Sequence, residues 1–155
     1  MNRTIVDYSQ DEASDWIAHL DCGHRQHVRH QPPFIERPWV TTREGRDLHL
    51  GQPLDCALCE RFQWPDDFEA YKRTPEFTAA TVPKGLLKEH STKTGVWARI
   101  VVLEGRLRYV VAPLNAAFVL DPATPGTVVP EVLHHVAPLG DVRFYVEFYR
   151  CSFKR

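Results

Sequence analysis

Four residues of this chain of 155 carry side chains that typically ligate zinc, and they occur in two short turns. Cys22 and His24 flank a glycine in Cys-Gly-His, and Cys56 and Cys59 form Cys-Ala-Leu-Cys. Structural zinc prefers four thiolate or imidazole ligands in a tetrahedron, and two short turns can each supply a pair. Because three thiolates and one imidazole leave no open position for a substrate, the pattern predicts a structural zinc rather than a catalytic one.

The spacing alone does not fix which histidine completes this site. His24, His27 and His30 lie three residues apart. We favour His24 because it shares a turn with Cys22, and His27 is the alternative ligand. Redox thiols and unrelated buried cysteines are the competing interpretations. The surrounding segment has few large apolar residues, and domains below about 70 residues commonly need a metal, a disulfide or a partner to be stable.

A change in composition near Phe62 predicts two domains. Most of the histidines and three of the four cysteines precede it, whereas the chain after it is rich in Val, Leu, Phe and Tyr. We expect a zinc-binding domain at residues 1–62, a linker at 63–77 that is rich in proline and aspartate, and a second domain at 78–155. Within the linker, residues 67–71 are expected to form one helical turn.

The expected elements are almost all strands. Residues 4–8 and 15–20 are predicted to form a hairpin around a polar turn. In the second domain, apolar runs 97–104 and 107–112 are predicted to form a hairpin turning at Glu104-Gly105-Arg106. Further strands are expected at 118–120, 127–129, 133–136 and 142–149. Short strands at regular spacing are typical of a sandwich or a barrel, so the fold class is mainly β.

Two histidines in the second domain are candidates for a further site. His90 and His134 are expected on neighbouring strands, where both could point into the mouth of a barrel and share a divalent metal. Strand alternation puts Glu147 on one face with Arg143 and Tyr145, and Glu147 is the candidate third ligand if that face lines the barrel. The competing interpretation is a pair of structural histidines whose ring nitrogens are hydrogen-bonded.

Several short motifs in the first domain are shared with a known group of sequences. They are Asp15-Trp16, Leu20-Asp21-Cys22-Gly23-His24, Gln26-His27-Val28-Arg29-His30, Pro38-Trp39-Val40 and Leu54-Asp55-Cys56. Over about residues 3–62 the chain resembles a family of short, uncharacterised bacterial proteins. This resemblance implies no known activity.

The second domain carries a different set of motifs. They are Gly85-Leu86-Leu87, Gly95-Val96-Trp97, Pro130-Glu131 and the strand 141–148, with His90 and His134 between them. Over about residues 76–150 the chain resembles the tellurite-resistance protein B N-terminal-like domain, a small cupin. This resemblance implies a double-stranded β-helix (jelly-roll) fold and, for some members, a link to tellurite or nitrogen-oxide stress. The expected architecture of the whole chain is therefore a zinc-ribbon-like β domain followed by a cupin domain.

The cupin metal motif is incomplete in this chain. Thr92 stands where a second histidine is usual, and Trp97 stands near the position of the usual glutamate. The three-histidine, one-glutamate site of cupins is therefore not intact, and only a reduced site could form from His90, His134 and Glu147. We expect binding rather than catalysis, and the sequence assigns no catalytic residue.

Bulk properties exclude several classes of function. The formal net charge is −1, so no bulk electrostatic attraction to nucleic acid or to an anionic membrane is expected. The first ten residues lack a basic start and an apolar core, and a cytoplasmic protein is predicted. Neither a Gly-x-Gly-x-x-Gly loop nor a βαβ pattern occurs, so S-adenosylmethionine-dependent methyl transfer is not expected of this chain by itself.

The sequence therefore predicts a stress-related binding or sensing module for a small ligand or an oxyanion. One alternative is a metal-dependent cupin enzyme, an oxygenase or isomerase, acting through His90 and His134. Another is a nucleic-acid-binding zinc ribbon, which the basic strip at 24–30 suggests and the acidic residues at 36–55 counterbalance. A homodimer is expected only by analogy with other small cupins.

Overall fold

The computed structural model describes residues 1–151 and places them in two compact units. The first unit is Met1–Asp66 and the second begins at Asp67, within the segment predicted as a linker. The last four residues of the predicted second domain lie outside the described residues. Because each unit has its own sheet and its own buried side chains, each is described by itself.

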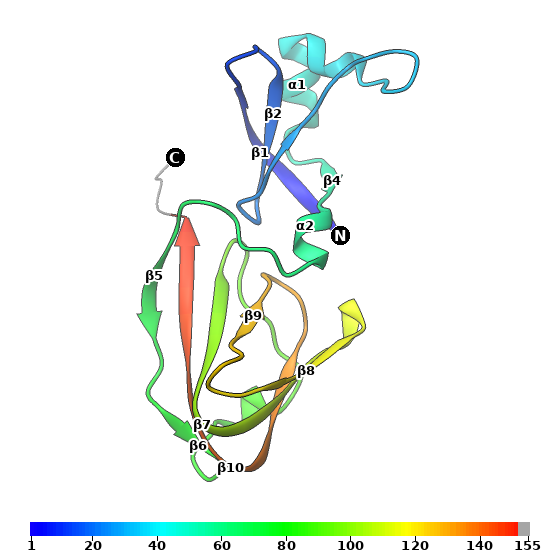
Figure 1. The fold of residues 1–155 in the computed structure, drawn as a ribbon. Helices are drawn as coiled ribbons and strands as arrows, with labels where there is room; N and C mark the ends of the chain where they lie inside the picture. The colour runs from blue at the N-terminus through cyan, green and yellow to red at the C-terminus, as the bar shows by residue number, and fades with distance from the viewer. Residues whose placement is uncertain (152–155) are drawn as a thin grey trace. The chain divides into compact units, whose positions relative to one another are not determined.

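The N-terminal unit is a four-stranded antiparallel sheet with short helices (Figure 1). Its elements are β1 (Asn2–Gln10), β2 (Trp16–Leu20), β3 (Arg25–His27), η1 (Pro38–Thr41), α1 (Arg43–His49), β4 (Pro53–Asp55) and α2 (Ala57–Glu60). The strand order is β3-β2-β1-β4, and the predicted first hairpin is confirmed by the pairing of β1 with β2. The carboxylate of Asp11 accepts the backbone N–H groups of Ala13 and Asp15, which closes the turn between these strands.

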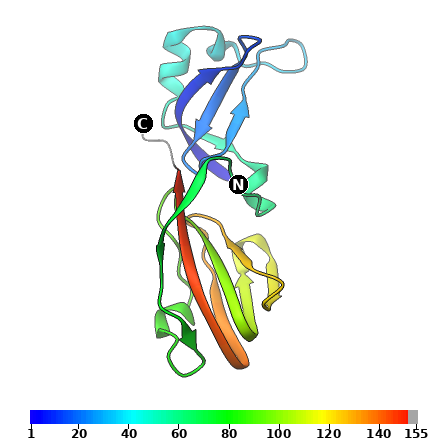
Figure 2. The same cartoon turned by 60° about the vertical axis from the view of Figure 1, so that its left-hand side comes forward.

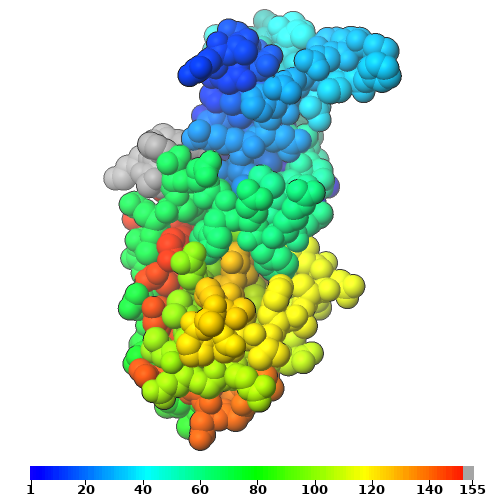
Figure 3. All heavy atoms as spheres, viewed as in Figure 1, coloured from blue at the N-terminus to red at the C-terminus, as the bar shows by residue number. Residues whose placement is uncertain are grey.

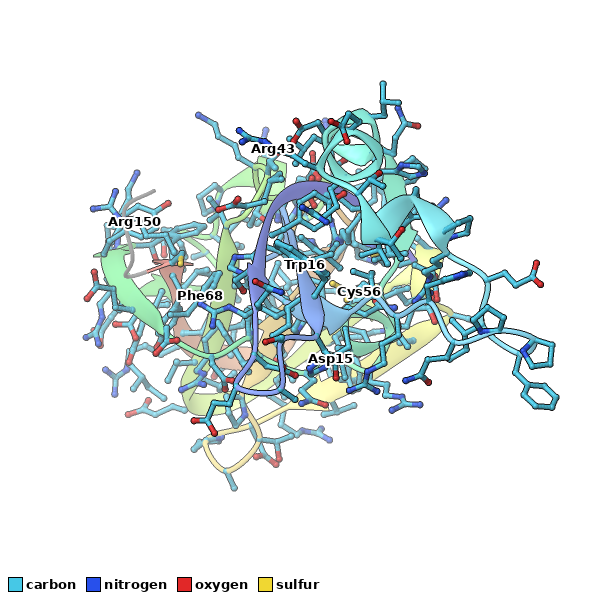
Figure 4. All side chains as sticks on the ribbon, turned by 90° about the horizontal axis from the view of Figure 1, so that it is seen from above. Asp15, Trp16, Arg43, Cys56, Phe68 and Arg150 are labelled. Atoms are coloured by element: carbon cyan, nitrogen blue, oxygen red, sulfur yellow. The ribbon has the colours of Figure 1, made fainter. Side chains whose placement is uncertain are left out.

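Few apolar side chains are buried in this unit. The fully buried aliphatic residues include Ile5, Ala18, Leu20 and Val28. Outside this cluster, the Arg46 guanidinium covers the ring of Trp16 at 3.8 Å (Trp16 is labelled in Figure 4). The unit therefore has a core too small to account for its order by apolar burial alone.

The segment between β3 and η1 extends away from the sheet of its own unit (Figures 1 and 3). Its ends are held by a bridge between Gln31 and Ile35 and by a hydrogen bond from the Arg37 N–H to Nδ1 of His30. Phe34, at its tip, is 94% exposed. Proline-rich composition explains why this segment forms no ladder, since proline has no N–H to donate.

The C-terminal unit is one curled antiparallel sheet, seen from a second side in Figure 2. Its elements are β5 (Phe68–Arg73), β6 (Phe77–Thr78), η2 (Lys84–Leu86), β7 (Trp97–Val111), η3 (Ala112–Leu114), β8 (Ala116–Leu120), β9 (Gly126–Val128) and β10 (His135–Cys151). The strand order is β5-β10-β7-β8, while β6 also pairs with β10 and β9 also pairs with β7. The prediction of a mainly β protein is confirmed.

The predicted hairpin at Glu104-Gly105-Arg106 is wrong, because β7 runs through it as one strand of 15 residues. Its partner β10 is also continuous, and the pairing passes from Leu107 opposite Pro138 to Gly105 opposite Val142. Gly105 has a φ of +79°, and a Cβ on it would lie 2.0 Å from the carbonyl oxygen of Asp141. The glycine therefore lets two long strands bend together, where the sequence pattern suggested a reversal.

Two other local predictions also differ from the structure. The expected helical turn at 67–71 is instead strand β5, which pairs with β10 from Phe68 opposite Cys151 to Arg73 opposite Glu147. The expected strands 133–136 and 142–149 are largely merged in β10. In both cases a long neighbouring strand offers a ladder of backbone hydrogen bonds that local composition does not reveal.

The core of the C-terminal unit contains large side chains. Trp97, Tyr109 and Phe144 are all fully buried. The hydroxyl of Tyr109 donates a hydrogen bond to the carbonyl oxygen of Thr127 at 2.7 Å, which satisfies its buried polar atom. Among residues 1–151, no helix is both long and apolar enough to cross a membrane.

Candidate metal centre and ligand cavity

The two predicted zinc turns meet in the N-terminal unit and form one buried cluster. Nδ1 of His24 lies 3.4 Å from Sγ of Cys22, 3.3 Å from Sγ of Cys56 and 3.5 Å from Sγ of Cys59. All four ligand atoms lie within 4.8 Å of one another. Bonds of about 2.0–2.3 Å to zinc give tetrahedral edges of about 3.3–3.8 Å, so the spacing fits one tetrahedral ion. The cluster could therefore hold a metal ion such as zinc.

Local backbone geometry explains why these four side chains converge. Gly23, with a φ of +93°, reverses the chain directly after Cys22 so that His24 returns to the same side. Cys56 is the residue preceding α2, and Cys59 lies within that helix, one turn later (Cys56 is labelled in Figure 4). The N–H of Cys56 donates to the carbonyl oxygen of Met1, which ties the second turn to the first strand.

Two further contacts orient the cluster and balance its charge. Nε2 of His24 donates a hydrogen bond to the carbonyl oxygen of Gln63 at 2.8 Å, which orients the ring so that Nδ1 faces the three sulfurs. Arg3 is buried, and its Nε–H donates to Sγ of Cys59 at 3.4 Å. Three thiolates and a neutral imidazole around a divalent ion carry one net negative charge, which the guanidinium of Arg3 offsets.

The protonation of the cluster also favours a metal. Hydrogen bonding with Cys56 is the main cause that raises the pKa of Cys22, and the same contact lowers the pKa of Cys56. Burial lowers the pKa of His24, but hydrogen bonds to Cys56 and Cys59 outweigh it and raise the pKa to about 9. The sulfurs and the imidazole must share protons when no cation is bound, and a divalent ion replaces those protons.

The structure places His24, and not the alternative His27, with the three cysteines. Nε2 of His27 lies 2.8 Å from the carboxylate of Asp11 at the protein surface. His30 accepts a hydrogen bond in the loop that carries Phe34. Three-residue spacing could not distinguish these histidines because it contains no information about where Cys56 and Cys59 lie.

A second candidate site is a cavity of about 440 Å³ in the C-terminal unit. Its apolar wall includes Ala98, Ile100, Val128, Val136, Phe144 and Phe148. His90, Thr92 and His134 also line it, while Lys72 and Lys93 line it but are exposed. A cavity of this size and character is typical of sites for small organic ligands.

His90 and His134 face each other in this cavity. Their backbones form an isolated antiparallel bridge with two N–H···O bonds of 2.9 Å, and their ring centroids lie 4.2 Å apart. Nδ1 of His90 lies 2.8 Å from the carbonyl oxygen of Lys88, and Nδ1 of His134 lies 3.0 Å from that of Val132. The two histidines were expected on neighbouring strands, and the structure pairs them by an isolated bridge outside the named strands.

His134 is the buried member of the pair, with 4% of its surface exposed. Burial is the main cause that lowers its pKa to about 4. The ring also packs edge-on against the ring of Tyr109, with centroids 5.6 Å apart. His134 is therefore a neutral imidazole at neutral pH.

The structure does not bring Glu147 to these histidines. Its carboxylate accepts hydrogen bonds from Arg73 at 2.9 Å and from the hydroxyl of Tyr149 at 2.6 Å. Val146 and Phe148, on either side of it, line the cavity instead. Alternation along β10 therefore puts Glu147 on the opposite face from the one expected. In residues 1–151, the cluster of three cysteines and His24 is the only group of three or more such potential ligands.

The sequence predicted a barrel mouth beside His90 and His134 but not the apolar residues that line the cavity, and it did not predict that Arg3 is buried. The available signal was the alternation of Ala98 with Ile100 and of Phe144 with Phe148, which marks the inward face of two strands. Arg3 alternates with the buried Ile5 in the same way. An empty space inside a sheet depends on how far its walls stand apart, and alternation does not give that distance.

Comparisons with protein families match each unit separately. Residues 6–63 match a family described as a protein of unknown function, DUF3565. Residues 72–146 match the TehB-like domain. The first match contains the metal cluster, and the second contains most of the residues that line the cavity.

Comparisons with individual proteins match the C-terminal unit. Two Haemophilus influenzae proteins, from strains Rd and 10810, are each named "Probable S-adenosyl-L-methionine-dependent methyltransferase TehB" and are 30% identical over 76 residues. The match covers 46% of this chain and 27% of each relative, so the chain spans about a quarter of their length.

Two solved structures resemble this one. The crystal structure of TehB from Haemophilus influenzae matches with a TM-score of 0.51 and 26% identity, over 56% of this chain and 32% of that one. A structural genomics crystal structure of an Escherichia coli K12 protein matches with a TM-score of 0.55 and 20% identity, over 60% of this chain and 91% of that one. The second likeness concerns the fold alone. The chain thus combines a region similar to the DUF3565 family with a TehB-like domain.

Proposed function

We propose that this protein is a non-catalytic binding or sensing module. Its N-terminal unit is held by a structural zinc, and its C-terminal unit is a cupin-type β domain that binds a small ligand in response to chemical stress. The observation that carries this proposal is the cavity of about 440 Å³, which has largely apolar walls and two histidines at one side.

The ligand set supports zinc as the metal. Three cysteines and one histidine form a common structural zinc combination, and soft thiolates disfavour magnesium and calcium. The cluster is completely buried, so an ion there would have no position for a substrate. Its role in this proposal is therefore to stabilise the N-terminal unit.

The chemistry of the cavity supports binding over turnover. A catalytic metal site commonly has three protein ligands and one open position. His90 and His134 supply two ligands, and Glu147 is engaged by Arg73 outside the cavity. The proposed role in stress rests on the similarity to TehB. The methyltransferase activity in the name of those relatives describes the relatives and is not assigned to this chain.

Metal analysis of the purified full-length protein tests this function. The wild type and a His90→Ala/His134→Ala double variant are measured side by side by plasma mass spectrometry. We expect about one zinc per chain in both proteins, because the cysteine cluster is unchanged in the variant. His27→Ala is the matched control, since this histidine lies outside both sites.

A second metal found only in the wild type would contradict the proposal and favour the metal-dependent enzyme. Zinc absent from both proteins would contradict the structural role of the cluster. Ligand binding is then measured by the shift in melting temperature, which rises when a molecule binds the folded state alone. Consumption of that ligand by the protein would also overturn a purely binding function.

A further inference from the structure

We propose that the cavity of the C-terminal unit takes an apolar small molecule that carries one hydrogen-bond donor, a hydroxyl or an N–H, rather than an inorganic oxyanion. This inference rests on the proposed binding function, and it specifies the class of ligand. It follows from which polar atoms of the cavity remain available and from whether each of them donates or accepts.

The histidine tautomers are fixed by their backbone contacts. A carbonyl oxygen can only accept a hydrogen bond, so Nδ1 of His90 must donate to Lys88 O and Nδ1 of His134 must donate to Val132 O. In a neutral imidazole the other nitrogen then carries a lone pair. Nε2 of each ring is therefore a hydrogen-bond acceptor.

These two acceptors are not used by the protein. Within residues 1–151, no hydrogen-bond donor lies in reach of Nε2 of His90 or His134. Although His134 is a buried residue, its Nε2 atom is not fully enclosed by the protein. It is thus reachable from the cavity that its residue lines. A ligand with an O–H or N–H would satisfy it.

Two hydroxyl groups of the cavity wall are already engaged by the protein, and the other two, on Tyr71 and Ser91, belong to exposed residues. Oγ1 of Thr92 donates to the carbonyl oxygen of Val96 at 2.6 Å, and Oγ1 of Thr74 donates to that of Pro75 at 2.9 Å. Each hydroxyl has a single proton, which these contacts already use. An oxyanion beside the histidines would therefore meet lone pairs, and like acceptors repel one another.

The walls also disfavour a compact, strongly hydrated anion. Ala98, Ile100, Val128, Val136 and Phe144 are buried apolar side chains on the lining. The two lysines of the lining, Lys72 and Lys93, are exposed, so their charges remain in water at the edge. An anion that entered would lose its hydration without gaining a paired charge, which is costly.

Size is consistent with a one- or two-ring organic molecule. The cavity measures about 440 Å³, whereas an engineered apolar cavity of about 150 Å³ is large enough to bind benzene. Burial of an apolar ring against these walls would drive binding, and the histidine acceptor would orient the ring. The chemistry therefore points to a phenol, an indole or a related aromatic amine.

Three matched probes and one inorganic anion test this inference on the full-length protein. The probes are 1-naphthol, with one hydroxyl donor, naphthalene, with none, and 1-naphthoate, with an anionic acceptor. Sodium tellurite is the anion. Dissociation constants are measured by calorimetry or by tryptophan fluorescence, at a pH above the ordinary pKa of histidine. We expect 1-naphthol to bind about three- to tenfold more tightly than naphthalene, the contribution of one net hydrogen bond.

Two variants locate the effect. His134→Leu removes the buried acceptor and should reduce the difference in affinity between 1-naphthol and naphthalene, and the additional change His90→Leu removes the second acceptor and should abolish it. His135→Leu is the control, because His135 contacts Glu89 outside the cavity and should leave the difference unchanged. Ala98→Leu should reduce binding of both probes by filling the cavity, and the melting temperature of each variant shows that it remains folded.

The outcomes separate this inference from the proposed function. Equal affinity for 1-naphthol and naphthalene in the wild type, or tighter binding of 1-naphthoate or tellurite, would overturn the ligand class and leave a binding module. A difference in affinity that is as large in His134→Leu as in the wild type would overturn the role of that histidine. Failure of all four compounds to bind would overturn both the ligand class and the binding function of the cavity.

Discussion

The two units of this protein reach order by different physical means. Eight buried residues in the N-terminal unit are apolar or cysteine, and three of them are the cysteines of the metal cluster. Among residues 67–151 of the C-terminal unit the corresponding set has 15 members, including Trp97, Tyr109 and Phe144. We therefore propose that the first unit relies on its candidate metal cluster, whereas the second is held by distributed apolar burial.

This difference also separates what each unit can do. A cluster with four ligands in a closed shell fixes the chain and has no position left for a substrate. A curled sheet with large side chains can instead leave a space between its walls, and here that space contains two unused acceptors. The metal centre is thus assigned to stability and the cavity to recognition.

Removal of the metal should have the largest effect, and it should affect only one unit. Structural zinc contributes on the order of 10–16 kcal/mol of apparent binding free energy in small zinc-dependent domains. Full-length protein treated with a strong chelator should lose the dispersed amide NMR signals of residues 1–66 and keep those of 67–151.

The variant Cys56→Ser should reproduce the effect of the chelator. Cys151→Ser is its control, because Cys151 is an exposed cysteine at the end of β10. If dispersed signals from both units survived complete removal of the metal, the small apolar core of the N-terminal unit would be sufficient. The contrast between the two units would then be lost.

A change in pH should have the next largest effect, and it should act on the C-terminal unit through His134. The folded pKa of this residue is lowered to about 4 from an ordinary value of 6.5. Below 6.5 the unfolded chain binds a proton that the folded chain does not bind, so stability falls from pH 6.5 to about pH 4 and is complete above that window. The shift corresponds to ~3 kcal/mol.

Urea unfolding followed through the amide signals of residues 67–151 measures this dependence. The titratable groups near the ring of His134 are His90, Glu89 and His135. His134→Leu should flatten the dependence in this window, whereas His135→Leu should preserve most of it. An unchanged slope in His134→Leu would assign the dependence to other groups.

The smallest effect is expected from a change at Arg3. It tests how much a residue next to the metal ligands contributes to metal affinity. Arg3→Met removes the buried guanidinium that donates to Sγ of Cys59. Loss of such an outer contact commonly lowers metal affinity by about 10–100-fold. Competition with a chromogenic chelator should show this loss for zinc, with partial recovery in Arg3→Lys.

Arg43→Met is the matched control for this measurement. Arg43 is exposed on α1, and its contact with Asp47 is a surface ion pair of 3.8 Å, which contributes little to stability. Equal zinc affinities in Arg3→Met and the wild type would mean that the charge of the cluster is balanced without Arg3.

The sequence predicted the metal cluster well because its geometry is local. Cys-Gly-His and Cys-Ala-Leu-Cys each bring two ligands to one side through a single turn, and the structure unites the two turns. The first hairpin was predictable for the same reason, since its strands are joined by a short polar turn. The mainly β class followed from composition and alternation along the chain.

The continuous bend of β7 and β10 at Gly105 and the outward side of Glu147 were decided by tertiary structure. Each depends on the register between segments far apart in the sequence, and a shift of one residue reverses which face a side chain occupies. The lining of the cavity beside His90 and His134 also depends on how distant strands pack. Residue types and their spacing determine which chemistry is available, and the packing of distant strands determines where that chemistry can act.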